Sequence, residues 1–198
     1  MIIETENISL LFNGISVFKN LSFRIGAGEN VCFSGPSGTG KSTLLRMLQG
    51  YVLPASGTIR IAGKELDAFN IRQIRQMMAY VPQNIHLPVG NGKELLKLTG
   101  RENNAMLTGE FIEKLGMTAG MLYRDFDEMS GGQKQRIVIA VCLSLQKEII
   151  LLDEPTSSLD DESTDRMIDV LENLEGKTLV SASHNHRWIR SAGKVISL

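Results

Sequence analysis

The sequence predicts an α/β fold in which helices cover a mostly parallel sheet, with an antiparallel β part at the N-terminus and an inserted helical part. Short strand-like and helix-like runs alternate along the 198 residues. The strand-like runs VCF, IILL and TLV are continuously apolar and bounded by Gly, Asp or Ser, which is typical of parallel strands buried on both faces. The first runs instead carry Asn-Gly and Gly-Ala-Gly-Glu turns, which are typical of antiparallel hairpins.

The individual elements follow from local pattern. Strands are expected at Ile2–Leu11, Leu21–Ile25, Val31–Ser34, Thr58–Ala62, Met78–Val81, Ile149–Leu152, Thr178–Ala182 and Val195–Leu198. Helices are expected at Lys41–Leu48, Ile71–Met77, Gly131–Gln146 and Glu162–Leu174. Residues 84–129 contain helical stretches such as KELLKL and EFIEKLG and no convincing strand. We therefore expect one domain, with a core formed by residues 1–83 and 130–198 and a helical subdomain at about 84–129.

Composition excludes several classes of protein. The 21 basic and 22 acidic residues leave the chain nearly neutral, so no nucleic-acid partner is expected, because such binding depends on a basic surface. The cysteines Cys32 and Cys142 lie far apart in apolar runs and are expected to be buried, reduced thiols of a cytoplasmic protein. The start MIIETENISL lacks a secretory pattern, and the longest apolar run, 137–145, is too short to span a bilayer.

A phosphate-binding loop is predicted after the apolar run VCFS. The segment GPSGTGKST matches the P-loop (Walker A) pattern G-x-x-x-x-G-K-[ST]. In such a loop backbone N–H groups converge on phosphate, the lysine reaches the β- and γ-phosphates, and the following hydroxyl holds Mg²⁺. The predicted nucleotide-binding residues are Gly35, Pro36, Ser37, Gly38, Thr39, Gly40, Lys41, Ser42 and Thr43. The pattern predicts a P-loop NTPase core but does not separate ATPases, GTPases and small-molecule kinases.

Two acidic residues end the strand-like run EIILLDEP at residues 148–155. Asp153 at the strand end is placed to hold Mg²⁺, directly or through water, and Glu154 is the candidate that polarises the attacking water. Acidic residues after a strand often only cap the next turn. A P-loop in the same chain favours the catalytic interpretation.

The segment MSGGQKQR raises a question of its own, because a helix-like run begins there on Ser130 followed by Gly131 and Gly132. Glycine in a helix costs about 1 kcal/mol relative to alanine, so the segment is either a loose cap or a place where something approaches the backbone closely. Together with GPSGTGKS, IILLDE and SSLD, it resembles the ATP-binding cassette (ABC) ATPase family over nearly the whole chain. The resemblance implies a homodimer on ATP binding, in which Ser130, Gly131, Gly132 and Gln133 of each subunit contact the ATP on the partner's P-loop.

The resemblance implies roles for four further residues. Gln83 in YVPQN would touch Mg²⁺ and the attacking water, and Asp160 in SSLD would belong to the D-loop that crosses the dimer interface. His184 in SASHN would contact the γ-phosphate, with His186 close by as the alternative. Phe12 would stack on adenine, or it is simply a core residue.

The function implied is that of an ATP-binding and ATP-hydrolysing subunit that powers an ABC transporter through dimer closure. Separate transmembrane permease subunits would contact residues 84–100, which places the chain on the inner face of the cell membrane. The alternative is a soluble ABC ATPase acting on DNA or ribosomes. The single cassette, the lack of a coiled-coil pattern in 84–129 and the near-neutral charge disfavour it. In the ABC ATPase family, Ser130 to Gln133 correspond to the signature motif, and we call them the signature segment. This segment and the D-loop disfavour a P-loop kinase or a GTPase, and the sequence also lacks the guanine-reading motif Asn-Lys-x-Asp.

Overall fold

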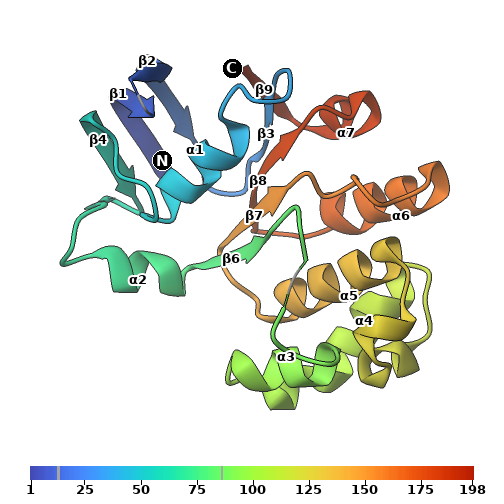
Figure 1. The fold of residues 1–198 in the computed structure, drawn as a ribbon. Helices are drawn as coiled ribbons and strands as arrows, with labels where there is room; N and C mark the ends of the chain where they lie inside the picture. Colours follow the sequence, from blue (N-terminus) through green and yellow to red (C-terminus); the bar gives the residue numbers. More distant parts are fainter. Residues whose placement is uncertain (13, 86) are drawn as a thin grey trace.

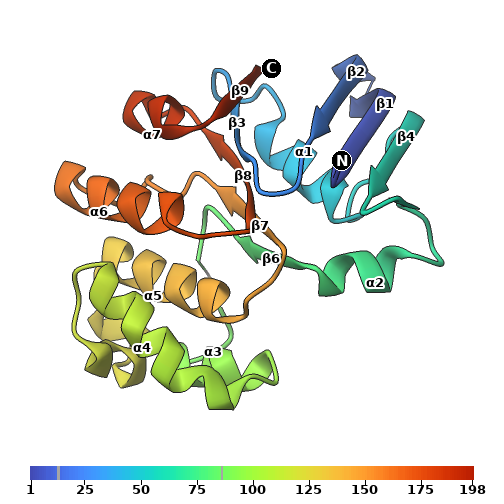
Figure 2. The same cartoon turned by 180° about the vertical axis from the view of Figure 1, so that it is seen from behind.

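The structure, a computed structural model, describes residues 1–12, 14–85 and 87–198. These residues form two sheets and a group of helices (Figures 1 and 2). The antiparallel sheet has the strand order β2-β1-β4-β5, and the parallel sheet has the order β6-β7-β8-β3-β9. The predicted α/β class, with its antiparallel N-terminal part, is therefore confirmed.

The strands of the antiparallel sheet are β1 (Ile3–Phe12), β2 (Ile15–Ile25), β4 (Ser56–Ile61) and β5 (Lys64–Glu65), and those of the parallel sheet are β3 (Asn30–Ser34), β6 (Met78–Val81), β7 (Ile149–Asp153), β8 (Thr178–Ser183) and β9 (Lys194–Ser197). The helices are α1 (Lys41–Leu48), α2 (Ile71–Gln76), α3 (Gly92–Leu98), α4 (Ala105–Lys114), α5 (Gly131–Ser144), α6 (Asp161–Glu172) and α7 (His186–Ser191). Short 3₁₀ helices lie at Glu102–Asn104, Ala119–Tyr123 and Phe126–Glu128. Between β6 and β7, the described residues form helices and loops and no strand.

Several elements differ from their predicted bounds. Strand β2 begins at Ile15 rather than Leu21. Its pairing with β1 contains register shifts, which interrupt the regular alternation of apolar and polar residues by which a strand is predicted. The Asn-Gly turn predicted before it includes Asn13, which lies outside the described residues. Strand β5 and helix α7 were not predicted. Helix α7 has only six residues, and the Asn185 side chain caps it by accepting hydrogen bonds from the backbone N–H groups of Arg187 and Trp188.

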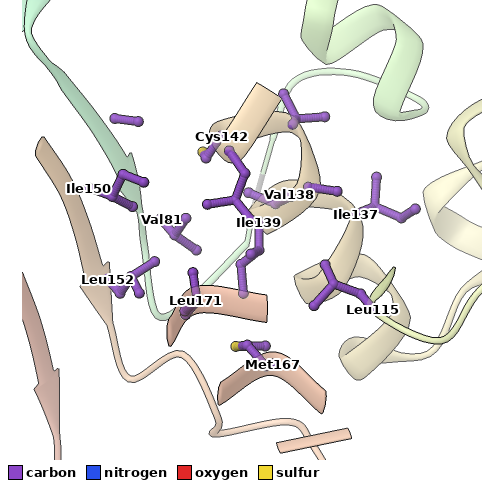
Figure 3. Packing of buried hydrophobic residues seen from close by; sticks show 14 of the residues in the cluster. Val81, Leu115, Ile137, Val138, Ile139, Cys142, Ile150, Leu152, Met167 and Leu171 are labelled. Atoms are coloured by element: carbon purple, nitrogen blue, oxygen red, sulfur yellow. The ribbon is translucent and has the colours of Figure 1, made fainter. Parts of the chain in front are cut away.

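The parallel sheet is buried on both faces. In β7, Ile150 and Leu152 point into a cluster with α5 and α6, while Ile149 and Leu151 point into the opposite cluster with α1 and the antiparallel sheet. Figure 3 shows the first cluster, where Met167 of α6 lies near the β7 and α5 side chains. Burial on both faces explains why the strand sequences are continuously apolar.

This parallel arrangement positions the candidate site. The strands β3, β8 and β7 pair in parallel, with Ser34 opposite Ser183 and Asp153 opposite Ala182. Their carboxyl ends therefore meet at one edge of the sheet, where ligands of open α/β sheets bind. Both cysteines are buried and free, as expected. Within residues 1–12, 14–85 and 87–198, no helix is both long enough and apolar enough to cross a membrane.

Candidate nucleotide site

The loop between β3 and α1 has a backbone that suits glycine. Gly40, just before α1, has φ +94°, a conformation that other residues rarely adopt. A Cβ there would lie 2.6 Å from Val17 Cγ1 and 2.8 Å from Phe18 Cζ, both on β2. The antiparallel sheet therefore packs directly against the phosphate-binding loop, and Gly40 is needed for that contact as well as for the turn.

Lys41 is buried, with 6% of its surface exposed. Its Nζ donates hydrogen bonds to the carbonyl oxygens of Gly35 (2.8 Å) and Pro36 (2.9 Å) and lies 3.9 Å from Glu154 Oε1. A buried ammonium group needs such partners, because water no longer solvates it. The same charge lies at the first residue of α1, whose N-terminal N–H groups favour an anion.

Asp153, at the end of β7, is held by two hydroxyl groups. Ser42 Oγ donates to its Oδ1 (2.8 Å), and Tyr80 Oη donates to its Oδ2 (3.1 Å). Burial raises the pKa of the Asp153 carboxyl, and the two hydrogen bonds oppose that rise. Burial and the neighbouring Asp153 raise the pKa of Tyr80 to about 12, so its hydroxyl keeps the proton that it donates.

These oxygen donors fit a magnesium ion. Mg²⁺ prefers hard oxygen ligands and takes few of them from protein, typically one or two carboxylates beside substrate phosphates and water. The Ser42 hydroxyl and the Asp153 carboxylate, already 2.8 Å apart, are such a set. Among the residues that the structure describes, no cluster of three or more His, Cys, Asp or Glu side chains is arranged to hold a metal ion, and Mg²⁺ does not require one.

The Glu154 carboxylate is buried and hydrogen bonded on both oxygens. Its Oε1 lies 2.9 Å from His184 Nδ1, and its Oε2 accepts hydrogen bonds from Ser183 Oγ and the His184 backbone N–H, both at 3.4 Å. His184 itself is exposed, with 66% of its side-chain surface accessible. Of the two histidines considered from the sequence, the structure brings His184 to Glu154, while His186 begins the exposed face of α7.

The Glu154 backbone adopts an unusual conformation. Its φ is +46°, which for a residue other than glycine costs of order 1–3 kcal/mol and needs support from its surroundings. The backbone N–H donates to Ala182 O (2.8 Å). The carbonyl accepts from the Ser157 N–H (3.1 Å) and from Gln135 Nε2 (3.2 Å).

One cavity joins most of the predicted residues. It has a volume of about 220 Å³ and is lined by Ser37, Gly38, Gly40, Lys41, Ser42, Thr43, Gln83, Glu154 and His184. Asp153 contacts this cavity through Ser42. Positive charge from the loop, hydroxyl groups and a buried carboxylate with its histidine therefore surround one space.

The signature segment lies outside that cavity. Ser130 caps α5 in a capping box: its Oγ accepts from the Gln133 N–H (3.2 Å), and Gln133 Oε1 accepts from the Ser130 N–H (3.0 Å). The loose cap considered from the sequence is therefore wrong. Gly132 lies tight against the D-loop of its own chain, because a Cβ there would be 2.6 Å from Ser158 O. Gly131 is exposed and lines a separate cavity of about 120 Å³ with Gln83 and Ser158.

Two of the predicted nucleotide-binding residues, Phe12 and Asp160, are not in the lining of the cavity of about 220 Å³. Phe12, at the end of β1, is 67% exposed, so it is not a core residue. Asp160 is the N-cap of α6, where its Oδ1 accepts from the Ser163 N–H at 2.7 Å. These hydrogen bonds to Ser163 lower the pKa of the Asp160 carboxyl.

Sequence reasoning missed three residues that contact the carboxylates of Asp153 and Glu154 or their backbone: Tyr80, Gln135 and Ser183. Each is brought to Asp153 or Glu154 by tertiary contacts over separations of 73, 19 and 29 residues. Ser183, the last residue of β8, could have been inferred from its place beside His184. Nothing in the local patterns of the other two marks them.

Comparison with known proteins decides the family. The ABC transporter family profile matches residues 18–157, which is more than half of the chain. The chain belongs to the ABC transporter family. This cassette is 34% identical to the energy-coupling factor transporter ATP-binding protein EcfA1 of Enterococcus faecalis, over 98% of its own length and 75% of that protein. It is 33% identical to the ABC-type transmembrane transporter verA of Clonostachys rogersoniana, of which it spans only 17%.

A solved structure with the same fold is a dimeric, post-hydrolysis form of the ATP-binding cassette MJ0796 bound to ADP and Pi. The TM-score is 0.86 at 26% identity, with 99% of this chain and 94% of that chain covered. This ABC cassette is therefore an ATPase that binds and hydrolyses ATP as the nucleotide-binding part of a transport system. The comparisons support this function. They do not support the alternative of a soluble ATPase that acts on DNA or ribosomes.

Proposed function

We propose that the cavity of about 220 Å³ is the ATP site and that Glu154 is the residue that activates the attacking water. The observation that carries the proposal is the position of the Glu154 carboxylate, 3.9 Å from Lys41 Nζ and 2.9 Å from His184 Nδ1. The side chains of Glu154, Lys41 and His184 therefore lie together in the lining of this cavity. Hydrolysis of a phosphoric anhydride needs such positioning and charge stabilisation more than covalent chemistry from the protein.

Each residue of the site has a role in this proposal. The N–H groups of the loop from Gly35 to Thr43 bind the phosphates, and Lys41 transfers its hydrogen bonds from the loop carbonyls to the β- and γ-phosphates. Ser42 and Asp153 would hold Mg²⁺, which neutralises charge on the phosphate oxygens when it is bound. Glu154 accepts a proton or hydrogen bond from the attacking water, while Gln83 orients that water and His184 contacts the γ-phosphate.

We also propose a homodimer in which each signature segment covers the partner's nucleotide. The Ser130 oxygen accepts a hydrogen bond from Gln133, but its hydroxyl proton remains able to donate to a phosphate oxygen. The backbone N–H of the exposed residue Gly131 and the N-terminal end of the fourteen-residue helix α5 favour the same anion. Gly132, Gln133 and the D-loop residue Asp160 would complete the interface, and Phe12 would stack on adenine from its exposed position.

The chain would act with separate membrane proteins. We propose that residues 84–129 form a helical subdomain on a core made of 1–83 and 130–198, and that its face around 84–100 contacts transmembrane permease subunits. The cassette would then be peripheral on the inner face of the cell membrane. The similarity to EcfA1, an energy-coupling factor transporter ATP-binding protein, supports this assignment.

The test separates binding from hydrolysis. Glu154→Gln should keep ATP affinity, lower kcat by roughly 10²–10⁴-fold because a general base is lost, and elute as a dimer when ATP is present. Lys41→Ala should lose ATP affinity and stay monomeric. Size-exclusion chromatography with and without ATP, combined with a phosphate-release assay, measures both variants. A Glu154→Gln chain that remains monomeric and hydrolyses ATP at the wild-type rate would refute the assignment.

A further inference from the structure

Gln135 is a buried polar residue to which the mechanism above gives no role. It lies on α5, with 1% of its surface exposed, five residues after the capping Ser130. A buried amide is costly unless both of its ends are hydrogen bonded. Its surroundings therefore indicate what the side chain is for.

One end of the amide is bound to the catalytic segment. Gln135 Nε2 donates to the Glu154 carbonyl oxygen at 3.2 Å. The orientation of the amide is unambiguous, because a carbonyl oxygen can only accept. The same carbonyl also accepts from the Ser157 N–H at 3.1 Å, so the loss of Gln135 would not leave it without a partner. The hydrogen bond from Gln135 therefore fixes the position of this peptide rather than rescuing an unpaired group.

The other end of the amide faces the adjacent cavity. Gln135 Oε1 has no hydrogen-bond partner among the residues that the structure describes. It belongs to the lining of the cavity of about 120 Å³ that Gln83, Lys134 and Ser158 also line. A buried acceptor beside a polar cavity of this size can be satisfied by water or by an N–H donor such as the Gln83 amide. Gln135 thus lies between the segment of Gln83 and the peptide of Glu154.

We infer that Gln135 is a positioning residue that holds the strained Glu154 peptide, and so aims the Glu154 carboxylate, from the helix that begins with the signature segment. The inference rests on the proposed function of Glu154. The φ of +46° at Glu154 must be maintained by its neighbours, and Gln135 is the side chain that supports it from α5. The side-chain direction follows from that backbone, so the carboxylate meets His184 only while the peptide keeps this conformation.

The arrangement links two sites within one subunit. Five residues of α-helix span about 7.5 Å, so Ser130 and Gln135 move as one rigid piece. In the proposed dimer, the first residue of α5 contacts the partner's ATP while Gln135 holds the subunit's own catalytic glutamate. A shift of α5 that improves one contact necessarily changes the other.

The experiment compares Gln135→Met with Lys134→Met, which replaces the neighbouring half-buried residue of α5 by the same side chain. Gln135→Met should lower kcat by roughly ten- to a hundredfold, as misplaced catalytic groups do, with an unchanged KM for ATP. Lys134→Met should keep the wild-type kcat. In the Glu154→Gln background, Gln135→Met should cause no further loss of hydrolysis, since both changes act through the same carboxylate. The double variant should still form the ATP-bound dimer.

Three results would overturn the inference: equal kcat values for the two methionine variants, a parallel loss of ATP affinity and kcat, or the same fold-loss from Gln135→Met when Glu154 is already Gln. Gln135→Leu provides a second replacement if the methionine variant does not fold. On the wild-type chain, the Gln135 side-chain amide protons should exchange with D₂O more slowly than those of the half-buried Gln133, and equal rates would exclude the hydrogen bond. If wild type hydrolyses ATP and Glu154→Gln does not, the proposed function stands whatever Gln135→Met does.

Discussion

The adjacent glycines of the signature segment should respond oppositely to alanine. At Gly132, an added Cβ would lie 2.6 Å from Ser158 O, whereas ordinary contacts begin at 3.4 Å, so the two atoms would overlap by about 0.8 Å. The obstacle is a backbone atom, so the D-loop itself must move. Overpacking of this kind costs about 1–3 kcal/mol. At Gly131 the nearest atoms are Ser158 Cβ and Oγ at 3.5 Å, which is ordinary contact.

The net free energies follow from these contacts. Alanine in place of glycine in a helix gains up to about 1 kcal/mol. Gly132→Ala should therefore lower the free energy of unfolding by up to about 2 kcal/mol, because the gain in helix propensity of about 1 kcal/mol offsets only part of an overpacking cost of about 1–3 kcal/mol. Gly131→Ala should leave it unchanged or raise it by up to about 1 kcal/mol. For a chain of this size 1 kcal/mol corresponds to roughly 2–4 °C in Tm, so the two variants should differ measurably.

The assay can use the fluorescence of the single tryptophan of the chain. Trp188 is buried, and its indole Nε1 donates to Ser181 Oγ at 2.9 Å, so unfolding in urea should shift its emission to longer wavelength. ATP-dependent dimerisation supplies a second measurement, which Gly131→Ala should weaken although its fold is intact. The reasoning fails if Gly132→Ala proves as stable as Gly131→Ala, since that would mean that Ser158 O does not constrain the helix.

Two further predictions concern buried titratable groups. The pKa of the Asp153 carboxyl is raised in the folded chain, whereas in the unfolded chain it is about 4. As the pH rises above that value, the unfolded chain loses this proton first, so the free energy of unfolding falls. Asp153→Asn should therefore unfold at higher urea than wild type at pH 7 while losing ATPase activity, with the gap closing on acidification; equal midpoints at pH 7 would contradict the burial penalty. Burial raises the pKa of Cys142 to about 12 and also raises that of Cys32, so an aromatic disulfide reagent at pH 8 should label neither thiol in the native chain and both in guanidinium. Rapid labelling of the native chain would disprove their burial.

Local sequence patterns were sufficient to predict the strands of the parallel sheet and the P-loop between β3 and α1. Strands buried on both faces must be apolar at every position, as Ile149 to Leu152 are, so the run of residues alone identifies them. The loop from Gly35 to Thr43 is encoded locally, since its glycines, the lysine and the preceding strand are neighbours in the chain. The P-loop in the same chain also led us to expect Asp153 and Glu154 at the nucleotide site, whereas His184 was expected there only from the resemblance to the ABC ATPase family.

The hydrogen bonds that hold Asp153 and Glu154 could not be predicted from the sequence, because they depend on tertiary contacts. The hydroxyl of Tyr80 on Asp153 and the amide of Gln135 on Glu154 depend on which strands pair and on how α5 lies against them. No local pattern encodes those distances. The same holds for Gly132: the sequence suggested a ligand as the reason for its missing side chain, and the structure adds Ser158 O of the same chain. The sequence shows which chemical groups a residue carries, but the packing of the strands and helices determines which other residues it contacts.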